Sequence, residues 1–210
     1  NDPVFSQEHL KTTWKETPVP SGEVPPWVIE EANEDLQRLA TTLVELGIIV
    51  HRPSDMDFVK QQGFYNYCPR DRLIVAGDSV IDTPMLYPCR DMEIEALNVV
   101  TSRAKKVYHM PRNAGMVLDA ANVLRLNDEW LYLVSESGNI EALQWLRKNV
   151  PNVSIEPCSF YSGVHIDSTI TIIREGLVVL NGSRVNHSNC PQVFDGWLKI
   201  YVNDVLPQDF

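Results

Sequence analysis

Residues 72–83, RLIVAGDSVIDT, are two short apolar runs joined by the turn Gly77-Asp78. Apolar and β-branched residues on both sides of a Gly-Asp pair are typical of a β-hairpin. The same arrangement recurs at 122–134 and at 169–180. The three turns lie at Gly77, Asn127 and Glu175, which are 50 and 48 residues apart (127 − 77 and 175 − 127). A fixed period of this size indicates a repeat protein, either a propeller or a solenoid.

A helical pattern and a further strand follow each hairpin. The first unit predicts a helix at 91–103 and a strand at 106–109, and the second a helix at 139–148 and a strand at 153–156. The third unit predicts a short helix at 192–197 and a strand at 198–202. Each unit is therefore strand, strand, helix, strand, which makes the protein α/β. An ordinary α+β sandwich is the alternative, but its hairpins would not be expected to recur so regularly.

The chain ahead of the first unit starts with a turn-rich stretch of about thirty residues. Apolar residues at helical spacing then predict a helix over Glu30–Leu46. Gly47 follows as a C-cap, and Ile48–Val50 is predicted to be a buried strand.

An aspartate stands just before the first strand of each hairpin: Asp71, Asp119 and Asp167, each 48 residues from the next. Aspartate often caps turns, so one such residue alone would carry little meaning. Equivalent positions of rotationally related units face the same axis, so the three carboxylates are expected to converge. Converging carboxylates repel one another unless a cation lies among them. A guanidinium fits this role because its planar N–H donors match carboxylates bidentately. A divalent metal is the rival, although the set of ligands is otherwise thin.

His165 lies two residues before Asp167, and both are predicted to lie on one strand, where side chains two apart project to the same side. Histidine is the usual general acid and base near neutral pH. A single histidine is more often structural, but the position of His165 among the aspartates predicts a catalyst. The other four histidines have no such setting and receive no role.

Composition and charge exclude several classes of protein. The net charge of −10 argues against a nucleic-acid surface, since phosphate binding needs clustered Lys and Arg. No apolar run reaches the ~18 residues of a membrane helix. The four cysteines are well separated without a CxxC pair, so neither structural zinc nor a disulfide framework is predicted. Because no signal peptide is apparent, we expect a cytoplasmic protein. We also expect a protein that needs no cofactor or metal.

Several segments resemble the amidinotransferase family, which includes glycine amidinotransferase and inosamine-phosphate amidinotransferase. The resemblance runs from about Val44 to Ile200, and its motifs are Pro69-Arg70-Asp71, Leu118-Asp119-Ala120-Ala121, His165-Ile166-Asp167-Ser168-Thr169 and Asn181-Gly182-Ser183-Arg184. It implies a five-bladed β/α-propeller of ββαβ repeats, the pentein type. Residues 1–210 would then be a single partial propeller domain with about three of the five blades.

The resemblance also implies roles for these residues. Asp71 and Asp167 would bind the guanidinium of arginine, and Arg184 would hold its carboxylate. Asp119 would orient His165, which would protonate the departing ornithine and then deprotonate the amine acceptor. The family's nucleophile is a cysteine that takes the amidino group as a covalent intermediate.

That cysteine is expected to be missing. In the family it lies in a Gly-rich His-Cys segment about a hundred residues beyond the His-x-Asp motif, whereas this chain ends 45 residues after His165 (210 − 165). Cys68 and Cys190 are the candidate replacements, but neither has the motif. We therefore expect a chain that is inactive alone and that associates with itself through the open faces of an incomplete ring. A guanidine-modifying hydrolase of the arginine deiminase kind and a non-catalytic binding propeller remain the alternatives.

Overall fold

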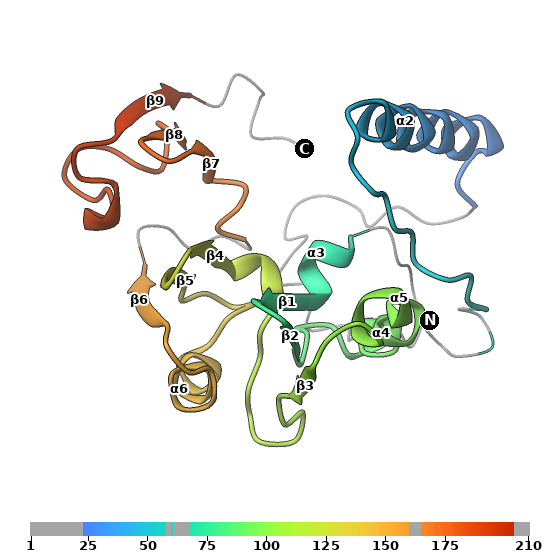
Figure 1. Ribbon diagram of the computed structural model, residues 1–210, viewed down its shortest axis with the longest axis horizontal. Coiled ribbons are helices and arrows are strands. Elements are labelled where there is room, and N and C mark those ends of the chain that lie inside the picture. The colour runs from blue at the N-terminus through green and yellow to red at the C-terminus, as the bar shows by residue number, and fades with distance from the viewer. Residues whose placement is uncertain (1–22, 58–59, 61–67, 160–164, 204–210) are drawn as a thin grey trace.

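The computed structural model describes residues 23–57, 60, 68–159 and 165–203. Among them are three separate three-stranded sheets, which lie side by side along an arc (Figure 1). In each sheet the first two strands form an antiparallel hairpin, and the third strand pairs parallel with the second. A parallel third strand requires a crossover connection, which explains the helical segment predicted between them. The three repeat units of the sequence are therefore confirmed.

The first unit consists of β1 (Leu73–Ala76), β2 (Ser79–Asp82) and β3 (Lys106–His109). Its crossover contains the 3₁₀ turn η1 (Pro88–Arg90) and two short helices, α4 (Glu93–Ala96) and α5 (Asn98–Thr101). The single helix predicted at 91–103 is thus broken, because Leu97 ends α4 with its amide bonded to the Ile94 carbonyl. The β-branched residues that follow have a lower helix propensity and do not favour continuation into one long helix.

The second unit consists of β4 (Val123–Leu126), β5 (Glu129–Leu133) and β6 (Ser154–Cys158). Its crossover helix α6 (Ile140–Asn149) is preceded by the N-cap residue Asn139, whose side chain accepts a hydrogen bond from the Ala142 amide. This N-cap satisfies one of the free amides of the first helical turn. The 3₁₀ turn η2 (Ala120–Asn122) precedes β4.

The third unit consists of β7 (Ile170–Arg174), β8 (Leu177–Asn181) and β9 (Leu198–Val202). The helix predicted at 192–197 is only the 3₁₀ turn η3 (Gln192–Phe194). The hairpin turns of the three units contain Gly77, Asn127 and Gly176, each with positive φ. Glycine and asparagine adopt this conformation at little cost, which is why the turns could be located in the sequence.

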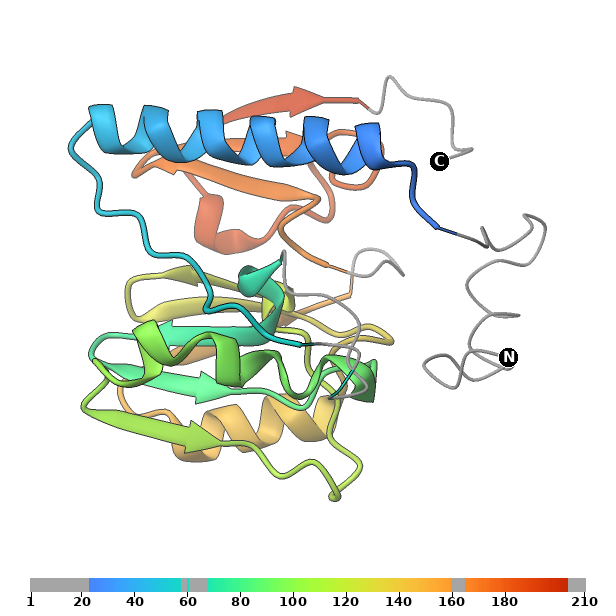
Figure 2. The same ribbon diagram turned by 90° about the vertical axis from the view of Figure 1, so that its right-hand side faces the viewer.

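Two hydrophobic cores join the units. One lies between the first two sheets and includes Ile81, Trp130, Tyr132 and Leu143, the last from α6. The other lies between the second and third sheets and includes Leu131, Leu133, Ile166, Val178, Leu180 and Phe194. Because successive side chains of a strand point to opposite faces, β5 contributes to both cores. The layered arrangement that results can be followed in Figure 2.

The segment before the first unit differs from the prediction. The helix α2 (Pro26–Glu45) is present, and Gly47 ends it with φ of 79°. No residue of α2 is buried. Ile48–Val50 does not form a strand, and the Ile49 side chain is exposed, so the prediction of a buried strand was wrong. A strand needs a neighbour to pair with, and none of the described strands pairs with this segment. None of the helices among the described residues combines the length and the apolar character that a membrane crossing requires.

Candidate active site

Each aspartate precedes the first strand of its unit. Asp71 lies in the short helix α3 (Pro69–Arg72), directly before β1. Asp119 is the N-cap of η2, and Asp167 lies in the turn that leads into β7. The prediction that His165 and Asp167 lie on a strand was wrong, because the amides of Thr169 and Ile170 bond back to the Ile166 carbonyl and form a turn. The common position of the three aspartates in the repeat places all three at the same end of the sheets, where the units meet.

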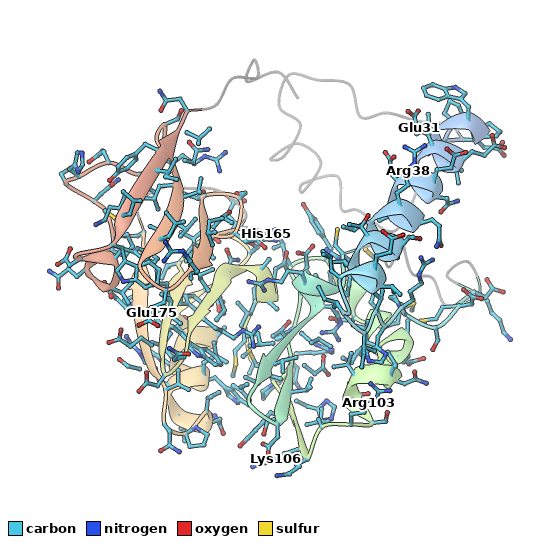
Figure 3. The ribbon with its side chains drawn as sticks, turned by 45° about the horizontal axis from the view of Figure 1, so that its top comes forward. Glu31, Arg38, Arg103, Lys106, His165 and Glu175 are labelled. Carbon is cyan, nitrogen blue, oxygen red and sulfur yellow. The ribbon has the colours of Figure 1, made fainter. Side chains whose placement is uncertain are left out.

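His165 lies between two of these carboxylates. Its Nε2 is 3.1 Å from Asp119 Oδ2, and its Nδ1 is 3.8 Å from Asp71 Oδ1. Figure 3 shows His165 near the centre of the molecule, where the three units come together. The fold therefore brings His165 into one site with Asp119 and Asp71, which lie 46 and 94 positions earlier in the chain (165 − 119 and 165 − 71).

The pKa of His165 is raised above its usual 6.5. Burial of the ring lowers the pKa, but the hydrogen bond with Asp119 and the charges of Asp71, Asp119 and Asp167 together outweigh burial. The site therefore favours the protonated imidazolium, which is the form that can protonate a leaving group.

Both carboxylate oxygens of Asp119 bond to the protein itself. The Leu86 amide donates to Oδ1 at 2.9 Å, and His165 Nε2 contacts Oδ2. Asp119 is 3% exposed. Because both oxygens are engaged in this way, Asp119 is suited to orienting the imidazole rather than to binding a substrate.

Asp71 has a different environment. The buried Arg90 donates from Nη1 to Asp71 Oδ2 at 3.0 Å. The other oxygen, Oδ1, faces His165 at the 3.8 Å separation given above. One oxygen is thus fixed by the protein while the other faces the site.

Asp167 is the most exposed of the three carboxylates, with 35% of its side chain accessible. Arg70 Nε lies 3.8 Å from its Oδ2. Arg70 also donates to the carbonyls of Ala120 and Val123, so it joins the first unit to the second and faces the third. Burial raises the pKa of Asp167, the nearby charges of Arg70 and His165 lower it, and the net shift is upward.

Arg184 lies beside the Asp167 turn. Its Nη1 donates to Ser168 Oγ at 3.2 Å and to Thr169 Oγ1 at 3.1 Å. The structure thus places all five predicted site residues, Asp71, Asp119, His165, Asp167 and Arg184, at or next to one region.

Three thiols have a pKa shifted away from the reactive form. Burial raises the pKa of Cys89, Cys158 and Cys190, in the case of Cys158 to about 12. A nucleophilic cysteine requires the opposite shift, since the thiolate is the reactive form. Among the residues that the structure describes, no group of three or more His, Cys, Asp or Glu side chains is arranged to hold a metal ion.

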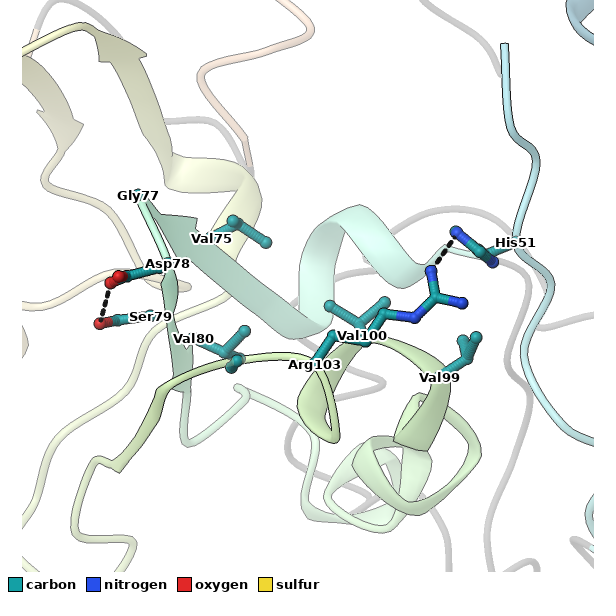
Figure 4. Close-up of a pocket in the computed structure, with 10 residues that line it drawn as sticks. His51, Val75, Gly77, Asp78, Ser79, Val80, Val99, Val100 and Arg103 are labelled. Atoms are coloured by element: carbon teal, nitrogen blue, oxygen red, sulfur yellow. Dashed lines mark hydrogen bonds between the residues drawn. The ribbon is translucent and has the colours of Figure 1, made fainter.

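A cavity lies away from these carboxylates (Figure 4). Val75, Val80, Val99 and Val100 contribute apolar surface to it, together with the turn at Gly77. This turn is at the opposite end of β1 from Asp71, so the cavity is separate from the candidate site.

Sequence reasoning missed three charged residues around the site. Arg70 belongs to the Pro69-Arg70-Asp71 motif, but its contact with Asp167 joins two different repeat units. Arg90 and Glu93 have the i, i+3 spacing of an ordinary helical ion pair. That spacing gives no sign that Arg90 also reaches Asp71.

Comparisons with known proteins identify the family of the chain. No family model matches the chain. Inosamine-phosphate amidinotransferase 1 of Streptomyces griseus is 34% identical over 99% of this chain and 69% of the relative. A solved structure of inosamine-phosphate amidinotransferase from Streptomyces griseus superimposes with a TM-score of 0.74 at 34% identity, covering 87% of this chain and 62% of that one.

A second solved structure supports the fold alone. It is SxtG, an amidinotransferase from Microseira wollei in the saxitoxin pathway, with a TM-score of 0.77 at 21% identity. It covers 96% of this chain and 68% of that one. The architecture and the 34% identity to the first of these structures define an α/β repeat protein of the guanidino-group-modifying class. Within that class, the chain belongs to the amidinotransferase family.

Proposed function

We propose that this protein transfers the amidino group of arginine to an amine acceptor. The observation that carries the proposal is His165, held at Nε2 by Asp119 while its Nδ1 faces Asp71. Inosamine phosphate appears in the name of the 34% identical relative, so a phosphorylated aminocyclitol is the first acceptor to test. Residues 1–210 would be a single partial propeller domain.

Asp71 and Asp167 are the proposed guanidinium ligands. Asp71 presents Oδ1 to the site, and Asp167 is the carboxylate with the greatest exposure. Two carboxylates on different units match the planar N–H donors of a guanidinium. Arg184, next to the Asp167 turn, would hold the carboxylate of arginine.

His165 would move the protons. A thiolate adds to the guanidinium carbon, and the bond from that carbon to the δ-nitrogen of ornithine breaks. His165 gives its Nδ1 proton to this nitrogen as ornithine leaves. The neutral imidazole then takes a proton from the acceptor amine as that amine attacks the carbon. The C–S bond breaks, which returns the thiolate and the imidazolium.

The thiolate would come from residues outside the segment 1–210. The raised pKa values of Cys89, Cys158 and Cys190 support this proposal, because they disfavour the thiolate. We therefore expect no ornithine from arginine and an amine acceptor with this chain alone. Adding the segment of an amidinotransferase that carries the His-Cys motif, as a separate polypeptide, would restore turnover.

The first experiment measures arginine binding by calorimetry or NMR. We expect a dissociation constant on the order of millimolar, because charge complementarity does not depend on the nucleophile. Asp167→Asn should weaken binding about tenfold, the loss of one charge-assisted contact. Asp128→Asn, on the exposed turn of the second hairpin, is the matched control and should leave binding unchanged.

The products identify the reaction. Ornithine release by this chain alone, abolished by Cys68→Ala or Cys190→Ala, would show that the nucleophile is one of its own cysteines. Citrulline in the complemented mixture would instead indicate a hydrolase of the arginine deiminase kind. Arginine binding without any turnover after complementation would indicate a non-catalytic binding protein.

A further inference from the structure

Asp71 contacts a buried pair of oppositely charged side chains, Arg90 and Glu93. Arg90 is 3% exposed and Glu93 is fully buried. Arg90 donates from Nε to Glu93 Oε1 at 2.6 Å and from Nη2 to Glu93 Oε2 at 3.0 Å. Its remaining terminal nitrogen, Nη1, donates to Asp71 Oδ2 at 3.0 Å. One guanidinium therefore bridges two carboxylates.

The division of contacts on Arg90 is informative. A bidentate pair fixes the plane of a guanidinium, because two parallel N–H donors must align with two oxygens. Glu93 therefore sets the orientation of Arg90. The orientation of Arg90 in turn sets the direction of Nη1, which is the atom that holds Asp71.

The charges are not balanced within this group. Asp71 and Glu93 carry two negative charges in their ionised forms, against one positive charge on Arg90. Burial raises the pKa of Glu93, its hydrogen bond and charge interaction with Arg90 lower it, and the net shift is upward. The second oxygen of Asp71, Oδ1, faces His165. A purely structural ion pair between Arg90 and Glu93 would need no second carboxylate directed into a site.

We propose that Arg90 is a positioning residue which, fixed by Glu93, holds Asp71 so that Oδ1 faces His165 and the bound guanidinium. The part that concerns the guanidinium rests on the proposed function. The part that concerns His165 rests only on the distances described here. Neither Arg90 nor Glu93 touches the substrate in this arrangement.

The test replaces the buried pair as a unit. Arg90→Gln alone would leave Glu93 as an uncompensated buried charge and would endanger folding. Arg90→Met/Glu93→Leu removes both charges with apolar side chains of similar volume, an exchange that is often tolerated. The double replacement leaves the net charge unchanged, so the variant reports on how the Asp71 carboxylate behaves when Arg90 no longer fixes it. The matched control Arg112→Met/Asp91→Asn removes another pair of opposite charges, one that has no bond to Asp71.

The main measurement is the pKa of His165 by NMR, supported by circular dichroism as a check of folding. In the folded Arg90→Met/Glu93→Leu variant, Asp71 is no longer held near Nδ1, so we expect the pKa of His165 to fall. The same double replacement in an Asp71→Asn background should cause no further fall, because the pair acts through Asp71. Arginine affinity should fall about tenfold in the first background and stay unchanged in the second. The Arg112 control should change neither quantity.

The outcomes separate this inference from the proposed function. A folded Arg90→Met/Glu93→Leu variant with the wild-type His165 pKa and arginine affinity would overturn the positioning role, even if Asp167→Asn weakened binding. An equal pKa change in both Asp71 backgrounds would overturn it as well. A coupled change in pKa without arginine binding by any form of the protein would support the positioning of Asp71 and reject the proposed function.

Discussion

His165 Nε2 lies 3.1 Å from Asp119 Oδ2, although the two residues are 46 positions apart and belong to different repeat units. The contact therefore exists only when the second and third units are packed together. It couples the protonation of the candidate catalyst to the integrity of the fold, and this coupling can be measured.

Asp119→Asn should lower the pKa of His165. The substitution keeps the shape of the side chain but removes the charge that helps to raise this pKa. NMR titration of the histidine ring is the measurement, with Asp128→Asn as the control for loss of an aspartate on the same unit. An unchanged His165 pKa in folded Asp119→Asn would contradict the assigned contact.

Protein stability should depend on pH through His165. Because the folded pKa lies above 6.5, the folded protein keeps a proton that the unfolded chain has begun to lose. The stabilisation is fully present below pH 6.5 and is lost as the pH rises through the folded pKa. Urea unfolding at about pH 5.5 and about pH 8.5 should show this loss in the wild type. The loss should be smaller in His165→Gln, and equal losses in both proteins would refute the assignment.

Gly138→Ala should destabilise the second unit. An added Cβ would lie 2.9 Å from the Leu133 carbonyl oxygen and 3.0 Å from Asn122 Nδ2, both in buried surroundings. Crowding of this kind costs about 1–3 kcal/mol. The neighbouring Ser137 carbonyl accepts from the Asp119 amide, so the pKa of His165 should change as well. A loss below about 0.5 kcal/mol in chemical denaturation would show that the loop relaxes freely.

The α2 helix should mediate self-association. Its apolar side chains include Trp27, Leu36, Leu39 and Val44, all more than half exposed. Exposed apolar surface of this extent favours association. Light scattering should show dimers or larger species at high concentration, and Leu36→Glu/Leu39→Glu should shift them toward monomer. Gln37→Glu/Thr41→Glu adds the same charges at two exposed polar positions of the helix and serves as the control. A wild-type monomer at high concentration would be the contrary result.

Features that depend on neighbouring residues could be predicted from the sequence, whereas features that depend on contacts between distant residues could not. The hairpins were predictable because a left-handed turn residue between apolar runs acts locally. The shared position of the three aspartates was predictable because they recur at the same spacing of 48 residues, and equivalent positions of a repeat have equivalent geometry. The strand expected at Ile48–Val50 failed because pairing requires a neighbour that local sequence does not specify. Arg90 escaped notice for the same reason, since its second partner, Asp71, lies 19 residues away (90 − 71).

The alternation of side chains along β5 has a consequence for folding. Trp130 and Tyr132 belong to one core while Leu131 and Leu133 belong to the other, so the middle unit cannot unfold without dismantling both cores. Independent repeats would melt in separate steps, whereas shared interfaces make neighbours cooperative. The three sheets should therefore unfold in a single transition, and the candidate site, which draws on all three, should disappear in the same step.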